Sequence, residues 1–183
     1  PLPNSQVRSM LKLMRDDLRQ MIDTGTSTSV QVPETPAQWM APLRHRFSRL
    51  FEELFIRVRW SMPPQWYTVP SPIQCLTLTR VLEEALTNIS KHSQAQNVLV
   101  EMKLEQADEL ILLISDDGIG FDVHTVQTHS MGVGMRSMLA RMERVSGSFQ
   151  LQSQPSGTTL TAILSLGRVH TSAATAPSSS SSS

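Results

Sequence analysis

The first periodic segment of the chain covers residues 6–23. Its apolar residues alternate spacings of four and three, the heptad pattern by which helices pair in a bundle or coiled coil. They are Val7, Leu11, Met14, Leu18 and Met21. An amphipathic helix packed on its own domain is the alternative, and we expect pairing. Residues 24–36 lack a helical period and carry two prolines, so they are predicted to be a linker.

A second amphipathic helix and a short strand follow the linker. Apolar residues return at helical spacing between residues 40 and 55, which predicts a helix with one apolar face. Residues 56–62 then alternate as a strand does. One side of its pleat carries Val58 and Trp60, and the other carries Arg57, Arg59 and Ser61. Prolines at positions 63, 64, 70 and 72 predict a rigid connection into the next helix.

The helix predicted over residues 79–93 has an unusual distribution of polar side chains. At about 100° per residue, its apolar residues fill one continuous arc. Glu84, Asn88 and Lys91 form a narrow stripe along the edge of that arc, whereas a surface helix normally places its charges opposite. A carboxylate, a carboxamide and an ammonium group at the rim of a core indicate a ligand site. A solvated helix flank is the alternative.

The rest of the chain is predicted to form four strands and one more helix. Alternation over residues 97–104 and an almost wholly apolar run over residues 110–115 predict two strands, the second buried on both faces of a sheet. A turn over residues 106–109 joins them. The remaining predicted elements are a helix over 135–145 and strands over 148–153 and 158–166. This mixed order indicates an α+β fold, a two-layer sandwich with its helices on one face of the sheet.

Composition narrows the classes of function. The 183 residues, 39% of them hydrophobic, suffice for one core and an appendage. The 16 basic and 16 acidic side chains cancel, which argues against nucleic acid or an anionic membrane as a partner. No apolar run approaches the roughly 20 residues that span a bilayer, and no signal-peptide pattern is present, so we expect a soluble segment that is not inserted in a membrane.

Three further features bear on compartment and completeness. Cys75 is the single cysteine, which excludes an internal disulfide and a cysteine-based zinc site and fits a reducing compartment. The chain begins at Pro1 without an initiator methionine, so we expect it to be part of something longer. Residues 167–183 end in a run of serines and are predicted to be disordered.

A glycine-punctuated segment ends the apolar strand. The sequence there is Asp116-Asp117-Gly118-Ile119-Gly120. Two glycines spaced by one residue let the main chain approach a flat ligand closely, and Asp116 is placed to accept a hydrogen bond from a ligand amine. A plain Asp-Gly turn is the alternative.

A second glycine pair precedes the next predicted helix. Gly132 and Gly134 lie directly before Met135, where unpaired amides and the positive end of the helix dipole would form an anion site. A glycine-capped helix start without a ligand is the alternative. Farther on, Gly157 and Thr158 place a hydroxyl group near a tight turn between two strands.

The order and spacing of these motifs resemble the ATP-binding catalytic domain of sensor histidine kinases, within the superfamily that includes gyrase, Hsp90 and MutL. The pattern is Glu-x-x-x-Asn-x-x-Lys-His, then Asp-x-Gly-x-Gly, Gly-x-Gly-Met and Gly-Thr. The stretches ALTNISKHS and GVGMRSMLARMERVSGSF are most similar to the nitrate-sensor and desaturase-sensor branch. The resemblance implies a Bergerat-type ATP-binding domain over residues 37–166, and makes residues 1–23 the second helix of a truncated dimerisation domain.

The resemblance also implies roles for individual residues. Glu84 matches the acidic residue that orients or activates the attacking group, and Asn88 matches the ligand of Mg²⁺. Asp116 matches the aspartate that reads the adenine amine of ATP, with Gly118 and Gly120 beside the base.

Further residues are expected to lie near the nucleotide, and residues 121–131 would form a short lid over it. These further residues are Lys91, His92, Gly132, Gly134, Met135 and Thr158. His92 lies in the last turn of its helix, where a C-terminal cap is the alternative role.

The function that the resemblance implies is transfer of the γ-phosphate of ATP to a histidine, and from there to a response regulator. The kinase would be a homodimer held by a helical hairpin, and this domain would be cytoplasmic, with any inner-membrane anchor upstream of it. In the family an acidic residue follows the phosphoacceptor histidine. None of His45, His92, His124, His129 or His170 is followed by one, so the acceptor is expected upstream of residue 1.

Two alternatives remain at the level of sequence. An anti-sigma-factor serine kinase shares the motifs, and the heptad segment before the domain argues against it. A non-catalytic nucleotide-binding interaction module is compatible with the missing acceptor histidine. The presence of both Glu84 and Asn88 argues against such a module.

Overall fold

The computed structural model describes residues 32–105, 108–122 and 130–167. The predicted heptad helix, most of the linker, the centre of the 106–109 turn, most of the lid and nearly all of the serine-rich tail lie outside these residues.

The described residues form one mixed sheet of five strands in the order β1-β2-β3-β5-β4. The strands are β1 (Arg57–Ser61), β2 (Asn97–Glu105), β3 (Glu109–Asp116), β4 (Ser148–Gln154) and β5 (Gly157–Ser165). β1 is parallel to β2, and the other neighbours are antiparallel. Each predicted strand is present, with ends that shift by at most one residue.

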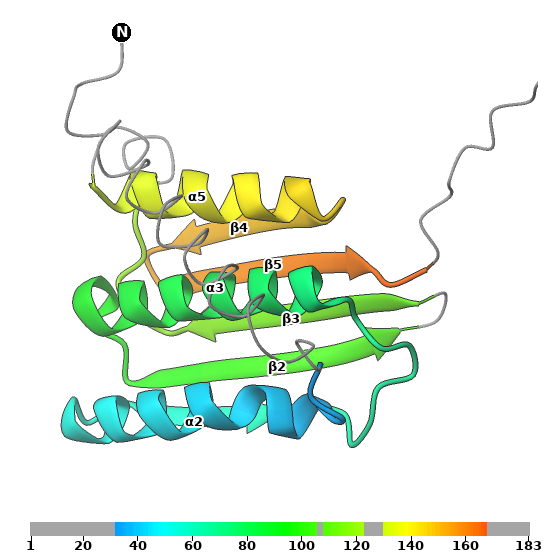
Figure 1. Ribbon diagram of the computed structural model, residues 1–183. Coiled ribbons are helices and arrows are strands. Elements are labelled where there is room, and N and C mark those ends of the chain that lie inside the picture. Colours follow the sequence, from blue (N-terminus) through cyan, green and yellow to red (C-terminus); the bar gives the residue numbers. More distant parts are fainter. Residues whose placement is uncertain (1–31, 106–107, 123–129, 168–183) are drawn as a thin grey trace, which may run out of the picture.

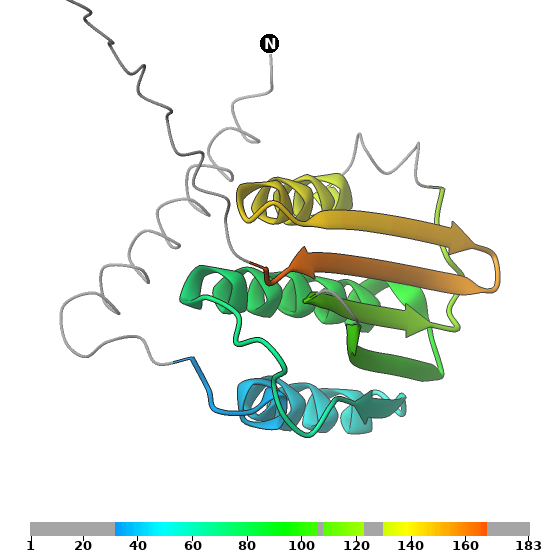
Figure 2. The ribbon, with the colours of Figure 1, turned by 90° about the vertical axis from the view of Figure 1, so that its right-hand side faces the viewer.

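Within the described ranges, three helices cover one face of this sheet. They are α2 (Pro36–Glu53), α3 (Pro72–Asn88), which continues into the π-helical turn η1 (Ile89–Ser93), and α5 (Ser130–Arg144). Figure 1 shows α2, α3 and α5 side by side over the strands, and the turned view of Figure 2 shows them gathered on one side of the sheet. The predicted two-layer α+β sandwich is therefore confirmed.

Prolines and short polar residues start the first two helices. Thr35 caps α2 by accepting a hydrogen bond from the Gln38 amide at 3.1 Å, and a proline follows it. Ser71 and Gln74 form a reciprocal capping box at the start of α3. Capping hydroxyls satisfy amides that have no partner inside the helix, and proline suits the first helical position because it has no amide hydrogen. The prolines before α3 thus lead directly into its first turn.

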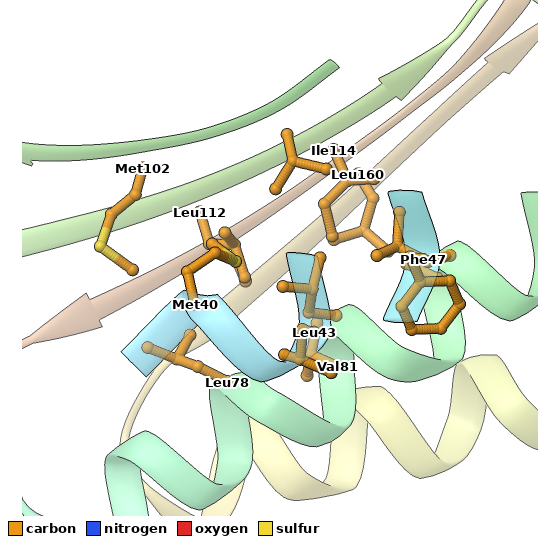
Figure 3. Packing of buried hydrophobic residues seen from close by; sticks show 14 of the residues in the cluster. Met40, Leu43, Phe47, Leu78, Val81, Met102, Leu112, Ile114 and Leu160 are labelled. Atoms are coloured by element: carbon orange, nitrogen blue, oxygen red, sulfur yellow. The ribbon is translucent and has the colours of Figure 1, made fainter. Parts of the chain in front are cut away.

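The core lies between the helices and the sheet. Figure 3 shows side chains of α2 and α3 meeting those of the strands, with Met40, Leu43, Phe47, Leu78 and Val81 on the helices and Met102, Leu112, Ile114 and Leu160 on the sheet. All nine are buried. Burial of apolar side chains on this scale is the main force that holds α3, and the site at its end, against the sheet.

The expectation that β3 is buried on both faces is wrong. Leu110, Leu112 and Ile114 are buried beneath the helices, while Ile111 and Leu113 on the opposite face are only partly buried. None of the described helices covers that face. β3 lies between β2 and β5, so side chains of these neighbouring strands cover its outer apolar residues only in part.

The predicted start of the last helix is also wrong. α5 begins at Ser130 rather than Met135, so Gly132 and Gly134 lie within its first turns and not in a turn before it. A Cβ atom at residue 134 would lie 2.0 Å from Oε1 of Glu84 on α3. Glycine at this position therefore permits close packing of α5 on α3. The spacing of the two glycines in the sequence does not distinguish such a helix contact from a turn.

Candidate nucleotide-binding site

In the described part of the chain, a cavity that is partly open to solvent lies between the end of α3 and the sheet, with α5 on its third side. Six of the predicted site residues line it, namely Asn88, His92, Asp116, Gly120, Met135 and Thr158. Its other walls are largely apolar, with Ile89, Ile114, Met138, Leu151 and Leu160 among them. The separate motifs of the sequence therefore converge on a single space that is apolar with a few polar groups, as small-molecule sites are.

Asp116 is the buried acceptor of this cavity. Its side chain is 8% exposed, and its Oδ1 accepts a hydrogen bond from the Gly118 amide at 2.8 Å. Burial raises the pKa of the Asp116 carboxyl. The hydrogen bond from Gly118 opposes this rise, and the nearby charge of Asp117 adds to it. Among the described residues Oδ2 has no hydrogen-bond donor, so the cavity offers an acceptor to a ligand amine.

The glycines after Asp116 are required by close contacts with the backbone. A Cβ atom on Gly118 would lie 2.2 Å from the carbonyl oxygen of Ser93, which also accepts a hydrogen bond from the Ile119 amide at 2.8 Å. Gly120 has φ +63°, and a Cβ atom there would lie 1.9 Å from the Gln154 carbonyl oxygen. The loop is thereby held against the end of η1 on one side and against β4 on the other.

Thr158 belongs to a short chain of hydrogen bonds that sequence reasoning missed. Its hydroxyl lies 2.9 Å from Oγ of Ser153, and Ser153 accepts a hydrogen bond from the Phe121 amide at 2.9 Å. Thr158 and Phe121 both line the cavity. Ser153 lies two residues after Leu151 on β4 and therefore on the same face of the strand. This spacing is a signal that could have identified it. These hydroxyls position the first residue of the predicted lid.

The polar stripe of the central helix divides in the structure. Asn88 ends α3 and lines the cavity, but Lys91 is exposed and does not line it, whereas His92 does. The reason is η1, whose π-helical turn takes more residues than an α-helical turn and changes the angular spacing after Asn88. Glu84 is partly buried against α5 at Gly134 and does not line the cavity. The roles of Glu84 and Lys91 toward a nucleotide stay predictions.

Asp117 has a structural task at the other side of the same loop. Its Oδ1 accepts hydrogen bonds from the Gln96 and Asn97 amides, both at 2.8 Å, and its Oδ2 accepts one from Nδ2 of Asn97 at 2.6 Å. These bonds lower the pKa of the Asp117 carboxyl, with the Asn97 side chain as the largest cause. Asp117 thus fixes the start of β2 relative to the loop that carries Asp116.

The donor set for a metal ion is sparse. Within the described ranges no three His, Cys, Asp or Glu side chains come together in a way that could hold a cation. Asn88 supplies one neutral oxygen at the cavity, which suits a hard divalent cation whose other ligands come from phosphates and water. As for membranes, none of the helices in residues 32–105, 108–122 and 130–167 is long and apolar enough to cross one.

Comparison with known sequences gives a family match over more than half of the chain. The sequence profile described as histidine kinase-, DNA gyrase B-, and HSP90-like ATPase matches residues 74–168. The sensor histidine kinase ComP of Bacillus subtilis (strain 168) is 35% identical over 78 residues, covering 43% of this chain and 10% of that protein. The sensor protein VraS of Staphylococcus epidermidis (strain RP62A) is 35% identical over 95 residues, covering 51% and 26%. The matched region is thus a small part of these relatives.

Solved structures show the same fold at low sequence identity. The histidine kinase AdeS of Acinetobacter baumannii matches with a TM-score of 0.64 and 15% identity, over 87% of this chain and 80% of that chain. The histidine kinase domain of a blue-light-activated kinase from Erythrobacter litoralis EL346 matches with a TM-score of 0.61 and 14% identity, over 86% and 84%. Both matches support the arrangement of helices and sheet described above.

Proposed function

Because the chain belongs to the family of histidine kinase-, DNA gyrase B- and HSP90-like ATPases, we propose that it serves as the catalytic domain of a two-component sensor histidine kinase. The resemblance to the ATP-binding domain of such kinases, inferred from the motifs, is confirmed. The finer assignment to the nitrate-sensor and desaturase-sensor branch stays a prediction. The observation that carries the proposal is that Asn88 and Asp116 open onto one cavity.

Asp116 would select adenine. A buried carboxylate at the end of an apolar cavity accepts a hydrogen bond from an exocyclic amine, and guanine presents a carbonyl oxygen where adenine presents that amine. Two acceptors cannot pair, so the buried carboxylate would be left without a donor against guanine. The apolar walls at Ile89, Ile114 and Leu160 suit the faces of a planar base.

Asn88 would bind Mg²⁺ together with the phosphates. When bound, the cation would neutralise charge on the phosphates during phosphoryl transfer. Asn88 lies at the same cavity as Asp116 but on the helix side, so the base and the phosphates would lie along the axis from β3 to the end of α3. Exposed Lys91, three residues on, is close enough along the chain to reach a phosphate from the solvent side.

ATP would have to enlarge the cavity on binding. The volume of the cavity is about 60 Å³, against roughly 300–1,000 Å³ for typical small-molecule pockets. Phe121, the first residue of the predicted lid, and Met135, four residues after its last, both line it. Their movement away from Asp116 would open the cavity toward the phosphates, so we expect the lid and the start of α5 to respond to nucleotide.

Phosphoryl transfer would need groups outside this chain. The acceptor would be a histidine of the dimerisation hairpin, and the final acceptor an aspartate of a response regulator. Glu84, one turn before Asn88, would orient the attacking imidazole, although it packs on α5 at Gly134 in this structure. The homodimer, the regulator and the kinase activity of the longer protein all belong to this proposal.

The test is phosphotransfer with radiolabelled ATP to a dimerisation domain supplied separately from a homologous kinase. We expect Mg²⁺-dependent labelling of its histidine by the wild-type chain. Asn88→Asp should change the Mg²⁺ dependence of ATP binding, and Glu84→Gln should slow transfer without changing ATP affinity. Mg²⁺-dependent binding without transfer to any histidine would favour the non-catalytic module. Labelling of a serine in a partner would favour the anti-sigma-factor kinase.

A further inference from the structure

Phe55, between α2 and β1, is almost wholly exposed in a backbone conformation that disfavours it. The end of α2 is a Schellman motif, in which the Phe55 amide donates to the Glu52 carbonyl at 3.1 Å and the Ile56 amide donates to the Phe51 carbonyl at 2.8 Å. The left-handed residue of this motif is usually glycine, but here Phe55 has φ +58° and is 93% exposed. Neither the backbone nor the core of the domain accounts for a phenylalanine there.

Two arginines follow Phe55 on the outer face of β1. Arg57 and Arg59 are exposed, and within the described part of the chain neither forms an ion pair or a side-chain hydrogen bond. They line an open groove of about 580 Å³ that also includes Asn97, Ser115, Ser156 and the acidic residues Asp116 and Asp117. Asp117 already accepts hydrogen bonds from Gln96 and Asn97, and Asp116 accepts one from Gly118. Among the described residues, the two arginines are therefore the charged groups of this groove without a partner, and guanidinium groups suit carboxylates.

β1 is also an edge strand. It stands at the end of the sheet order, with β2 as its neighbour. The Arg57 amide donates to the Gln96 carbonyl on the β2 side at 2.8 Å. Because strand residues alternate in direction, the backbone groups of Val58 and Trp60 point to the free edge. An extended segment of another protein could add to this edge by backbone hydrogen bonds.

The segment that leads into and includes β1 is basic, although the chain as a whole has no net charge. The basic residues between positions 44 and 59 are Arg44, Arg46, Arg49, Arg57 and Arg59, and the acidic ones are Glu52 and Glu53. Arg46 on α2 is paired with Glu83 at 2.8 Å, so the proposal uses the two arginines of β1 alone. The parts of this chain outside the described ranges are not acidic. Residues 1–31 have four basic and three acidic side chains, and residues 168–183 have one arginine and no acidic residue. Charge therefore favours a different, acidic protein over this chain's own segments.

We propose that Phe55, Arg57 and Arg59, here named the β1 edge surface, dock an extended acidic segment of a partner protein. Phe55 is the apolar anchor, and the two arginines hold carboxylates along the outer face of the strand. A buried aromatic residue with arginines at its rim is the usual composition of an energetically dominant contact. The surface lies outside the nucleotide cavity, since none of the three residues lines it.

The test uses the full 183-residue chain labelled with ¹⁵N. The probe is a synthetic peptide of alternating glutamate and valine, about ten residues long so that an extended chain covers β1. Titration should shift the amide signals of β1 and of the start of β2. A peptide with glutamine in place of glutamate should bind at least about tenfold more weakly. No shift up to about 1 mM peptide, or shifts confined to other elements, would overturn the proposal.

Variants separate docking from folding. Arg57→Glu combined with Arg59→Glu should weaken peptide binding at least about tenfold, whereas Lys103→Glu on the same outer face of β2 is the matched control and should not. Phe55→Gly should weaken binding and raise the midpoint of thermal unfolding, because glycine suits the left-handed position. If either Phe55→Gly or the double arginine variant left peptide affinity unchanged, the proposal would fail.

The last part of the test uses other polyanions as controls. A single-stranded oligothymidine and vesicles containing phosphatidylserine are titrated into the same labelled chain. We expect neither to shift the β1 signals as the acidic peptide does, since neither can add backbone hydrogen bonds to the free edge of a strand. Binding of either polyanion at the β1 edge surface with equal affinity would overturn the assignment to a protein partner.

Discussion

At the scale of single residues, Asp116 and Asp117 are adjacent in sequence and opposite in environment. Asp116 is buried at the cavity with one amide donor, and its pKa is raised; Asp117 is exposed with three donors, and its pKa is lowered. The buried carboxylate of Asp116 is thus available to a ligand but lowers the stability of the unliganded fold. The carboxylate of Asp117 stabilises the fold.

Asp116→Asn should therefore separate stability from function. Asparagine keeps an oxygen that accepts from the Gly118 amide but removes the buried charge. Because the raised pKa means that ionisation opposes folding, we expect the free energy of unfolding at pH 7 to be unchanged or higher. As pH falls through the folded-state pKa, the wild type should gain stability relative to the variant. Chemical unfolding over a pH series measures this, and marked destabilisation at pH 7 would contradict it.

Asp117→Asn should show the opposite pH dependence. The folded-state pKa of Asp117 is lowered, so its stabilising contribution is present above the unfolded value of about 3.9 and is lost as pH falls through the folded-state pKa. The variant should be less stable than the wild type at pH 7, and the difference should shrink below about pH 4. Unfolding curves at both pH values test this. A difference that stayed constant would show that the hydrogen bonds at Gln96 and Asn97 do not depend on the charge.

Sequence reasoning at this scale found the residues of the cavity better than their partners. Asp116, Asn88 and Thr158 were identified because their spacing matched a known pattern. Ser153 was missed, since the alternation that places it on the same face as Leu151 was not used to look for partners of Thr158. Lys91 was expected beside Asn88, but a π-helical turn cannot be read from the α-helical period that predicted it.

At the scale of elements, two glycines that look alike in sequence have different structural causes. Gly118 lies against the backbone carbonyl of Ser93, so the loop after β3 contacts the end of η1. Gly134 lies against the end of the Glu84 side chain, so α5 contacts α3. Backbone cannot move without shifting a whole element, whereas the end of a side chain can adopt another rotamer.

Gly118→Ala and Gly134→Ala should accordingly differ in severity. At Gly118 the added Cβ would lie 2.2 Å from a carbonyl oxygen, so the loop must separate from η1, and we expect a loss of about 2–3 kcal/mol in the free energy of unfolding. At Gly134 the Glu84 carboxylate can move aside, and we expect a loss under about 1 kcal/mol. Urea unfolding of the two variants compares them directly. Equal losses would mean that the Glu84 side chain is as fixed as backbone.

The positions of the elements could largely be predicted, while the starts of the helices could not, since α2 and α3 begin four and seven residues before the predicted ranges. The alternation in β1 and β2 and the helical period of α2 agree with the structure because burial of one face imposes them. The start of α5 was misplaced by five residues. Two glycines favour a turn by local propensity, and packing of α5 on α3 overrides that propensity.

At the scale of the whole molecule, the fold brings segments that are distant in sequence close together in space. The end of α3, the loop after β3, α5 and the strands β4 and β5 meet around one cavity, although they are separated in sequence. The mixed sheet makes this possible, since β3 lies in its centre and ends at Asp116 beside both neighbours. The open outer face and the β1 edge surface form a second region, whose groove meets the cavity at Asp116.

The most direct measurement of the central claim is calorimetric titration of the wild-type chain and of Asp116→Ala with ATP and with GTP in the presence of Mg²⁺. We predict that the wild type binds ATP more tightly than GTP by at least about tenfold, because the buried carboxylate pairs with an amine and not with a carbonyl oxygen. Asp116→Ala should lose this preference. An unchanged preference for ATP in the variant would contradict the assignment of the cavity as the adenine site.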